Sequence, residues 1–324
     1  MSGQMSEPRH QPVLLSEVLH LLAPRAGGNY VDGTFGAGGY ARAILEAADC
    51  RVWGIDRDPG AIARGAELAR HFAGRLVLIE GRFGEMDRLL SDRGLADADG
   101  IALDLGVSSM QLDEAERGFS FRADGPLDMR MGSEGESAAD IVNRAAEKDL
   151  ADILFRYGEE RRARAIAKAI AKRRATTPFK RTGELAEIVR GVLGRRSKDA
   201  IDPATRSFQA LRIAVNDELG ELDRGLVAAE AMLKPGGRLA VVSFHSLEDR
   251  RVKSFIRQRT GRAPESSRYL PATQRPAPSF RRCPGDEAVP TAGEIAANPR
   301  SRSARLRGAE RSADAPWGAL EEAA

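Results

Sequence analysis

The chain has 324 residues, of which 42% are hydrophobic and 5% aromatic, so it can form a sizeable core packed mainly by aliphatic side chains. The two cysteines, Cys50 and Cys283, exclude a disulfide framework, and the four scattered histidines lack zinc-site spacing, so we expect no metal. The net charge is only +3, but most basic residues are arginines, which suit phosphate recognition; a coding bias toward arginine gives the same composition. Without a signal peptide or an apolar run of membrane-spanning length, we expect a soluble, cytoplasmic protein with no membrane partner.

The polar residues 1–9 are expected to be disordered, and the apolar spacing after them predicts a helix over residues 16–22. A strand–turn–helix–strand pattern then covers residues 29–58. Its first strand ends at Asp32, a turn rich in glycine follows, and the second strand ends at Asp56. This order is typical of one half of a nucleotide-binding α/β unit.

The glycine turn has the composition of a cofactor-binding loop. Glycines allow positive φ angles and let the backbone approach a ligand closely. The N–H groups of residues 39–41, which open the next helix, point toward any bound anion. Asp56 lies twenty positions after Gly36, a spacing that places a carboxylate on ribose hydroxyls. An adenosine-type cofactor is therefore expected.

Two such cofactors fit the turn. The pattern Gly36-x-Gly38-x-x-Ala41 matches the dinucleotide fingerprint, which would make the protein an NAD(P)-dependent oxidoreductase. Asp32 would crowd a pyrophosphate there, but it suits the ammonium and sulfonium groups of S-adenosylmethionine. A plain tight turn does not explain why both strands end in an acid. The methyl donor is therefore the better interpretation.

The next elements continue the α/β pattern. Residues 59–72 predict a helix, and residues 76–79 predict a third strand. The apolar positions of the helix are Ile62, Ala66 and Ala69. In the loop after the strand, Phe83 either stacks on an adenine or simply covers the end of the sheet, and the pattern favours neither.

A fourth strand over residues 100–105 contains a third acid, Asp104, near its end. Together with Asp32 and Asp56, Asp104 would place three acids at the same edge of the sheet. Clustered carboxylates repel one another unless a cation or hydroxyl donors lie between them. This repetition supports a ligand with cationic groups.

Residues 106–135 show neither strand nor helix periodicity, and a loop this long inside a compact domain is usually functional. It contains Ser108, Gln111, Phe119 and Phe121. Residues 137–193 then have helical patterns only.

The predicted helix over residues 160–174 begins with Arg161, Arg162 and Arg164, and a further basic run follows at residues 195–198. A basic helix is more often a solvated face. Beside a cofactor site it is also a candidate for phosphate contacts with a nucleic acid. The charge pattern alone leaves both interpretations open.

The α/β pattern resumes after this insertion. The predicted elements are helices over residues 205–219, 222–233 and 247–259 and strands over residues 238–243, 280–283 and 304–308. His245 follows the strand at 238–243, where it either accepts a proton or contacts RNA, or is a neutral structural histidine. Residues 312–324 are expected to be a flexible tail.

Several long blocks are chemically unusual, among them YVDGTFGAGGYARAIL, LDLGVSSMQLDEAERGFSFRADGPLDMRM and LKPGGRLAVVSFHSLEDRRVK. From about His10 to Arg311 the chain resembles the bacterial small-subunit ribosomal RNA cytosine-N4 methyltransferases of the MraW type. The resemblance implies an α/β fold of the class I S-adenosylmethionine-dependent kind, a Rossmann-like doubly wound sheet with an inserted all-helical domain. Residues 10–109 and 205–311 would form the methyltransferase domain, and residues 110–204 an inserted loop and helical substrate-recognition domain.

The resemblance also implies methylation of the exocyclic amine of a cytidine in the decoding region of 16S ribosomal RNA, within the small subunit. By motif position, the residues that bind S-adenosylmethionine would be Gly38, Gly39, Tyr40, Asp56, Phe83, Asp104 and Gln111. Tyr40 stands where a histidine is expected, so the backbone contact is kept while any polar role of an imidazole is in question. A second copy of the chain is a further candidate partner.

Cytosine N4 shares its lone pair with the ring and is a poor nucleophile, so such an enzyme must hold it in line with the methyl group. Familiar amino-methyltransferases have an acid or amide followed by two prolines and an aromatic after the fourth strand, and this chain lacks those prolines. The catalytic candidates are Asp104, Ser108 and His245. The candidates for RNA contact are Phe119 and Phe121, which would stack on a base or pack in the loop, together with Arg161, Arg162 and Arg164.

Two other classes of function remain as alternatives. An oxidoreductase would bind NAD in preference to S-adenosylmethionine. A non-catalytic ribosome assembly factor would bind ribosomal RNA tightly, would be indifferent to the donor and would transfer no methyl group.

Overall fold

The computed structural model describes residues 12–194, 202–262 and 276–318. The expectations for residues 1–9 and for the basic run at 195–198 lie outside the described residues. Within the part of the chain that is described, no helix is both long and apolar enough to span a membrane.

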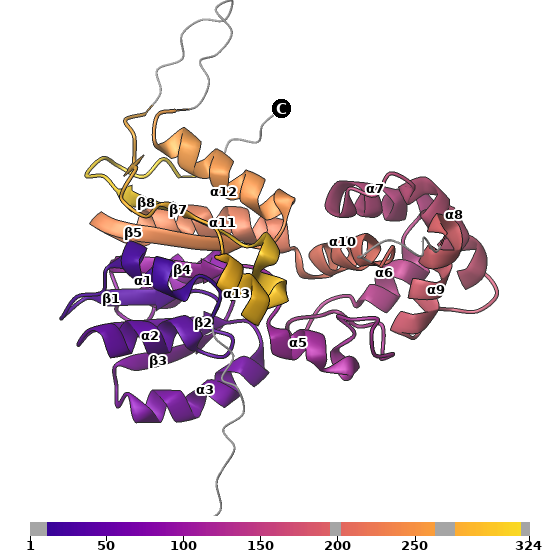
Figure 1. Ribbon diagram of the computed structural model, residues 1–324, viewed down its shortest axis with the longest axis horizontal. Coiled ribbons are helices and arrows are strands. Elements are labelled where there is room, and N and C mark those ends of the chain that lie inside the picture. The colour runs from indigo at the N-terminus through magenta and orange to yellow at the C-terminus, as the bar shows by residue number, and fades with distance from the viewer. Residues whose placement is uncertain (1–11, 195–201, 263–275, 319–324) are drawn as a thin grey trace, which may run out of the picture. The chain divides into compact units, whose positions relative to one another are not determined.

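The chain folds into two compact units, which are coloured by residue number in Figure 1. The sheet unit comprises Met1–Gly106 and Gly220–Ala324, and the helical unit comprises Val107–Leu219. The division at Gly106 is close to the boundary expected after residue 109. The second division lies fifteen residues beyond the one expected after residue 204, because the intervening helix packs in the core of the helical unit.

The sheet unit is built on one mixed sheet. Its strands are β1 (Asn29–Asp32), β2 (Arg51–Asp56), β3 (Leu76–Glu80), β4 (Ala98–Asp104), β5 (Leu233–Ser243), β6 (Phe280–Arg281), β7 (Glu287–Ala288) and β8 (Arg305–Arg311). Their order is β3-β2-β1-β4-β5-β8-β6, with β7 also paired to β8. Strands β1 to β5 run parallel and β8 is antiparallel to β5. The winding order reverses between β1 and β4, the place where such sheets bind ligands at the carboxyl ends of their strands.

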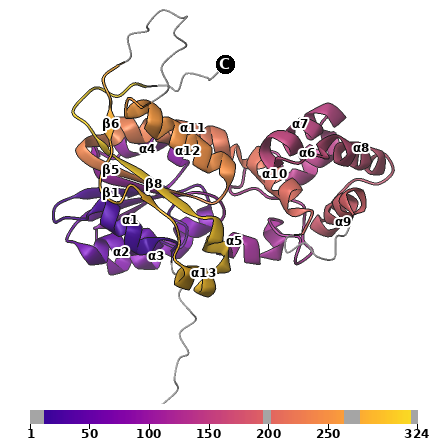
Figure 2. The same ribbon diagram turned by 45° about the horizontal axis from the view of Figure 1, so that its top comes forward.

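Helices cover both faces of this sheet (Figure 2). They are α1 (Leu15–Leu22), α2 (Gly39–Ala47), α3 (Pro59–His71), α4 (Met86–Ser91), α11 (Glu218–Met232) and α12 (Ser246–Arg259). A further helix, α13 (Ala292–Ala297), contributes no residue to either core. One core packs α1, α2 and α3 against Tyr30 and Val52, and the other packs α4, α11 and α12 against Val31 and Ile55. Because both faces are buried, the strands are almost continuously apolar. The predicted doubly wound sheet is confirmed.

The buried face of α3 differs from the expected one. Its buried residues are Ala61, Gly65 and Leu68, whereas Ala66, one of the predicted positions, is exposed. A Cβ atom on Gly65 would lie 2.4 Å from Cε1 of Phe35, so only glycine lets that ring lie against the helix. The apolar pattern was misread because the key packing residue has no side chain.

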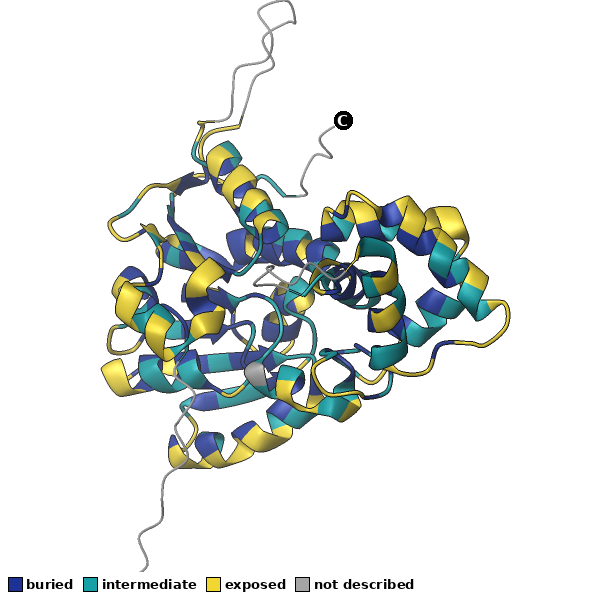
Figure 3. Cartoon of the chain, turned by 45° about the vertical axis from the view of Figure 1, so that its right-hand side comes forward, coloured by how far each residue is buried: buried dark blue, intermediate teal, exposed yellow. Residues whose placement is uncertain are grey.

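The helical unit has its own core, and buried and exposed positions alternate along its helices (Figure 3). Its helices are α5 (Ser109–Asp113), α6 (Ala138–Arg144), α7 (Glu147–Gly158), α8 (Ala163–Arg174), α9 (Thr182–Leu193) and α10 (Thr205–Asn216). The region 106–135 is not without structure as expected, because it contains α5 and a 3₁₀ helix, Ala115–Arg117. The predicted all-helical pattern over 137–193 is confirmed.

Two helix boundaries in this region were predicted wrongly. Helix α8 begins at Ala163, so Arg161 and Arg162 precede it. The helix expected over residues 205–219 ends at Asn216, because Asp217 takes a left-handed conformation with φ 50° and a new helix, α11, begins after it.

The residues after β8 are held rather than loose over the part that is described, up to residue 318. Glu230 in α11 is fully buried and forms an ion pair with Arg259 in α12, with Oε2 3.3 Å from Nε. Its other oxygen accepts hydrogen bonds from the Ser279 hydroxyl and from the backbone N–H of Trp317, the latter at 3.0 Å. The carboxylate thus ties α11 to the C-terminal segment.

Replacing Glu230 with glutamine is expected to lower the free energy of unfolding by about 3 kcal/mol, because the Arg259 guanidinium would remain buried without its counter-charge. Urea unfolding followed by tryptophan fluorescence measures this, since both tryptophans, Trp53 and Trp317, lie in the sheet unit. The control is Glu85→Gln, which removes the exposed ion pair with Arg88 and should cost no more than about 1 kcal/mol. Equal losses in the two variants would contradict the role given to Glu230.

Candidate functional site

The acids at the carboxyl ends of β1, β2 and β4 are the centre of the candidate site. Asp32 is buried, and its two oxygens accept hydrogen bonds from the N–H of Thr34 at 3.3 Å and from the N–H of Ala41 at 3.1 Å. The carboxylate therefore joins the glycine turn to the first turn of α2. Burial raises the pKa of Asp32 to about 7, against the effect of these two bonds.

Asp56 holds the other side of the same turn. One oxygen accepts a hydrogen bond from the N–H of Gly36 at 2.7 Å, and the other from the N–H of Asp58 at 2.8 Å. Burial raises its pKa as well. A carboxylate oxygen has more than one acceptor position, so these bonds leave capacity for ribose hydroxyls.

Asp104 differs from the other two acids because its carboxylate is poorly satisfied. Its N–H donates to Oγ1 of Thr34 at 2.6 Å, but its Oδ1 is buried and has no hydrogen-bond partner among the described residues. Burial, followed by the nearby charges of Asp32 and Glu248, raises the pKa of Asp104 well above its ordinary value. A cation or a hydrogen-bond donor from a ligand would satisfy this carboxylate.

The N-terminus of α2 offers donors beside these acids. Gly36 and Gly38 have φ angles of 53° and 76°, which the turn requires and which favour glycine. The N–H groups of Gly39 and Tyr40 have no hydrogen-bond partner in the described part of the chain. An anionic group such as a carboxylate can bind there.

The side chain of Tyr40 is committed elsewhere. Its ring is buried, and its hydroxyl donates to the backbone carbonyl of Val13. Pro12 lies so close to Gly39 that a Cβ there would be 2.1 Å from its Cγ. Tyr40 therefore fixes the N-terminal segment over the turn and offers only its backbone N–H to a ligand.

Phe83 lies at the end of β3, in a 3₁₀ helix, Phe83–Glu85. Its ring contacts α11, because a Cβ on Gly225 would lie 2.4 Å from its Cδ2, and its own Cβ is near Gly33. The ring is only half-buried. It therefore packs on the core and also keeps a surface on which an adenine can stack.

Glu221, which the sequence analysis overlooked, supports this edge from α11. Its Oε2 accepts hydrogen bonds from Arg57 at 3.0 Å and from Arg82 at 3.1 Å. Burial raises the pKa of Glu221, and the two arginines oppose this shift. Arg57 follows Asp56 and Arg82 precedes Phe83. The Glu221 carboxylate therefore fixes the two loops that carry these candidate ligand-binding residues. The sequence signal for Glu221 was an acidic residue on the apolar face of a predicted helix, where an unpaired charge is rare.

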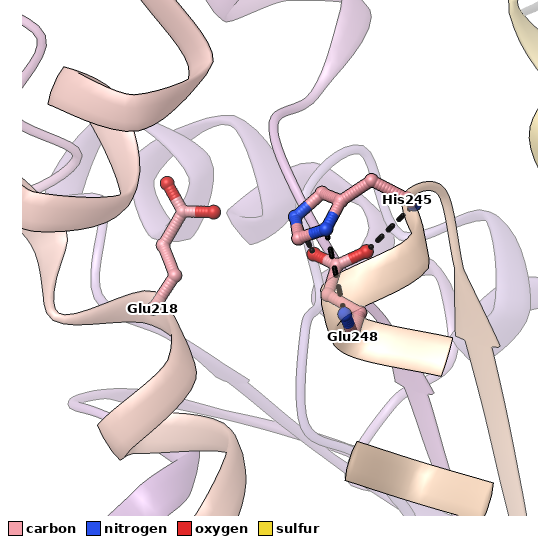
Figure 4. Close-up of side chains that lie close together, drawn as sticks. All are labelled: Glu218, His245 and Glu248. Atoms are coloured by element: carbon pink, nitrogen blue, oxygen red, sulfur yellow. Dashed lines mark hydrogen bonds and ion pairs between the residues drawn. The ribbon is translucent and has the colours of Figure 1, made fainter. Parts of the chain in front are cut away.

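His245 is the N-cap residue of α12 (Figure 4). Its Nδ1 accepts a hydrogen bond from the N–H of Glu248 at 3.4 Å, and its Nε2 lies 3.1 Å from Oε1 of the same residue. The other carboxylate oxygen of Glu248 accepts from the N–H of Phe244 at 2.8 Å. Glu218, also drawn in Figure 4, belongs to the helical unit and pairs there with Arg212. Both ring nitrogens of His245 thus lie near Glu248, although Nε2 is buried and makes no hydrogen bond with a described residue.

Ser108 and Gln111 belong to the helical unit and form a capping box at the start of α5. The Ser108 hydroxyl accepts from the N–H of Gln111 at 3.2 Å, and the Gln111 side chain accepts from the N–H of Ser108 at 3.1 Å. The spacing matches the Ser-x-x-Gln helix start, a signal that the sequence analysis did not use.

The two phenylalanines expected to stack on RNA are used for packing. Phe119 is buried in the core of the helical unit. Phe121 packs edge-on against Phe208, with ring centroids 4.7 Å apart, and the guanidinium of Arg190 lies 5.4 Å from its ring centre. In this structure Phe119 has no surface for a base.

The arginines around α8 fall into two groups. Arg161, Arg162 and Arg164 are exposed and form no ion pair with the described residues. Arg173 pairs with Glu184 at 3.0 Å, and Arg174 donates to backbone carbonyls of α6 and of the residue that follows it. The first group is available to a partner, whereas the second holds the helical unit together.

Comparison with known proteins agrees with this geometry. The profile of the MraW methylase family matches residues 7–312. The ribosomal RNA small subunit methyltransferase H of Paramagnetospirillum magneticum is 61% identical over 315 residues, covering 97% of this chain and 99% of the relative. Proteins of the same name from Parvibaculum lavamentivorans and Rhodospirillum rubrum are 61% and 59% identical, covering 96% and 95% of this chain and 92% and 96% of the relatives.

The sheet unit has the doubly wound order and the glycine turn of the class I S-adenosylmethionine-dependent methyltransferase fold, and the helical unit is inserted after its fourth strand. The profile spans nearly the whole chain, including both units. The chain therefore belongs to the MraW methylase family.

Proposed function

We propose that this protein transfers a methyl group from S-adenosylmethionine to N4 of one cytidine in the decoding region of 16S ribosomal RNA, in the cytoplasm. The family and the names of the relatives support ribosomal RNA of the small subunit as the substrate. The observation that carries the proposal is the buried, unsatisfied Oδ1 atom of Asp104 beside Asp32, at the point where the sheet reverses its order. Choice of the cytidine and of its N4 atom rests on the resemblance of the motifs.

The residues fit the donor group by group. The free N–H groups of Gly39 and Tyr40 would hold its carboxylate, and Asp32 with Asp104 would hold its positive charges. Asp56 would accept hydrogen bonds from the ribose. The half-buried Phe83 ring would cover the adenine, and Gln111 is a further contact implied by motif position. Bound there, S-adenosylmethionine supplies an electrophilic methyl group.

Among the catalytic candidates, Asp104 has the free acceptor. Its Oδ1 can accept a hydrogen bond from an amine, which favours a pyramidal and more nucleophilic nitrogen. The Ser108 hydroxyl already accepts a bond in the capping box, and both nitrogens of His245 face Glu248. We therefore assign hydrogen bonding to the cytosine amine to Asp104 and a structural role to His245.

RNA would be bound by the arginines that form no ion pair with a described residue. Arg161, Arg162 and Arg164 are exposed, and guanidinium groups pair with phosphate oxygens in two-pronged contacts. Because none of the three forms an ion pair with a described residue, their guanidinium groups are available to phosphates.

The alternative cofactor is disfavoured by the acids. A dinucleotide would place its anionic pyrophosphate at the turn closed by Asp32 and close to Asp104, two acids that offer it no positive charge and would have to stay protonated beside it. A non-catalytic assembly factor would have no use for a donor site of this composition.

The first test is methyl transfer from labelled donor to small ribosomal subunits that lack the modification, followed by digestion and mass analysis of the nucleosides. N4-methylcytidine at a single decoding-region position is the expected product. Donor binding without any methylated nucleoside would refute the proposed reaction, and a different methylated nucleoside would refute the assignment of N4.

Replacing Asp104 with asparagine is expected to stabilise the ligand-free protein at neutral pH and to weaken donor binding about tenfold or more. Between an ordinary carboxyl pKa of about 4 and its raised value, Asp104 holds a proton in the folded state that the unfolded chain has released, so stability falls as pH rises. The stability gained by the variant over the parent should therefore grow from about pH 5 to about pH 7. Thermal unfolding and calorimetric titration measure the two effects.

Asp97→Asn is the matched control, because Asp97 is exposed and its replacement should alter neither quantity. A stability difference for Asp104→Asn that stays constant with pH would contradict the cost assigned to the buried carboxylate. Unchanged donor affinity would remove Asp104 from the donor site.

Replacing Arg161, Arg162 and Arg164 together with glutamine is expected to weaken RNA binding and to flatten its salt dependence by about 2 units of log K per log salt, because fewer counterions are released. Donor affinity should be unchanged. Filter binding at several salt concentrations measures the slope. The control is the triple replacement of the exposed Arg51, Arg70 and Arg93 in the sheet unit. An equal change in slope for the control would show that the effect comes from total charge and not from the positions of Arg161, Arg162 and Arg164.

A further inference from the structure

One aromatic side chain in the helical unit is left in solvent. Phe155, on α7, is 63% exposed, although aromatic residues make up only 5% of the chain. The other phenylalanines of the unit are used in its interior: Phe119, Phe179 and Phe208 are buried and Phe121 is half-buried. A single exposed apolar residue is ordinary on a protein surface, so the surroundings of Phe155 decide its meaning.

Those surroundings are strongly basic. Four exposed arginines follow Phe155 within nine residues of the chain, Arg156, Arg161, Arg162 and Arg164, and the exposed Arg206 contacts the end of its helix. The guanidinium of Arg206 donates to the carbonyl of Glu159 at 3.5 Å, which places the start of α10 one helical turn beyond Phe155. None of these arginines forms an ion pair with a described residue.

The acids in the same place do not balance this charge. Glu160 is buried and accepts a hydrogen bond from the N–H of Arg162 at 2.8 Å. Glu159 is exposed and Asp152, one turn before Phe155, is half-buried. The surface therefore combines one free aromatic ring with an excess of guanidinium groups. We call it the Phe155 surface, meaning Phe155 and the arginines named above.

We propose that the Phe155 surface binds single-stranded RNA, with the Phe155 ring stacked on an unpaired base and the arginines on the flanking phosphates. Proteins that bind single strands combine these two features, a stacking aromatic and a basic track along the backbone. The proposal rests on the proposed function and extends it, because it gives the helical unit a base contact that Phe119 and Phe121 do not provide in this structure.

The charge also argues against a protein partner. Stable interfaces between proteins have cores that are depleted of charge and contain several apolar anchors. Here a single ring lies beside a net excess of arginines, and two copies of the surface facing each other in a symmetric dimer would bring those arginines together. A polyanion relieves that repulsion, whereas a second copy increases it.

The test compares Phe155→Ala, Phe155→Leu and Phe155→Trp in the full chain. The probes are a cytidine-rich single-stranded RNA of about 16 nucleotides and small ribosomal subunits that lack the modification. Alanine and leucine are expected to weaken RNA binding about tenfold without changing the salt slope, because stacking is lost while the phosphate contacts remain. Tryptophan is expected to keep the affinity, and RNA should quench its fluorescence above the background of Trp53 and Trp317.

Val289→Ala is the matched control, since Val289 is 58% exposed but lies in the sheet unit. It should leave RNA affinity unchanged, and donor affinity should be unchanged in every variant. Parent-like RNA binding by Phe155→Leu would overturn the stacking proposal. So would a change of oligomeric state in Phe155→Ala with RNA binding intact, which would identify a protein interface.

The two proposals fail separately. If the parent protein methylates no RNA but Phe155→Ala still weakens RNA binding, the proposed reaction is wrong and the Phe155 surface stands. If methylation proceeds and the phenylalanine variants bind RNA like the parent, the reaction stands and the stacking proposal is wrong.

Discussion

The structure depends on carboxylates buried where the sheet reverses its winding order. Asp32 bonds to the turn and to α2, and Asp56 bonds to the turn and to the start of α3, so these two side chains shape the whole glycine loop. Taking an ionised carboxylate out of water costs several kcal/mol, and backbone N–H groups offset only part of that cost. The part of the desolvation cost that is not offset raises the pKa of Asp32 to about 7. The empty site is therefore held in an electrostatically unfavourable state.

The same cost favours a cationic ligand. Asp104 receives no hydrogen bond at its Oδ1 from the described residues, so a positive group placed there would favour the ionised carboxylate over the protonated form. Stability of the ligand-free protein and affinity for the ligand consequently oppose each other at this residue. The loop glycines serve this arrangement, because side chains at Gly36 and Gly38 would be strained at positive φ and would deform the turn.

The alternation of strands and helices and the acids at the sheet edge could be predicted from sequence, because β1, β2 and β4 are short apolar runs that end in an aspartate. The start of α6 is also written in the local sequence, where Ser137 and Asp140, three residues apart, form a capping box. The predictions that were wrong concern features that depend on tertiary contacts. Gly65 forms the face of α3 because Phe35 lies on it, and Asp217 breaks a helical pattern that has no glycine or proline to mark the break.

The roles of individual arginines and phenylalanines were unpredictable for the same reason. By composition α8 is basic along its whole length. In the structure Arg173 forms an ion pair and Arg174 donates to backbone carbonyls, whereas Arg164 forms no ion pair with a described residue. Likewise the sequence does not show that Phe119 is buried and Phe155 exposed, because packing decides both. A charged or aromatic side chain can contact a partner only when it is neither buried nor already paired within the protein. The residues left over after the core is satisfied are therefore the ones from which a binding surface can be inferred.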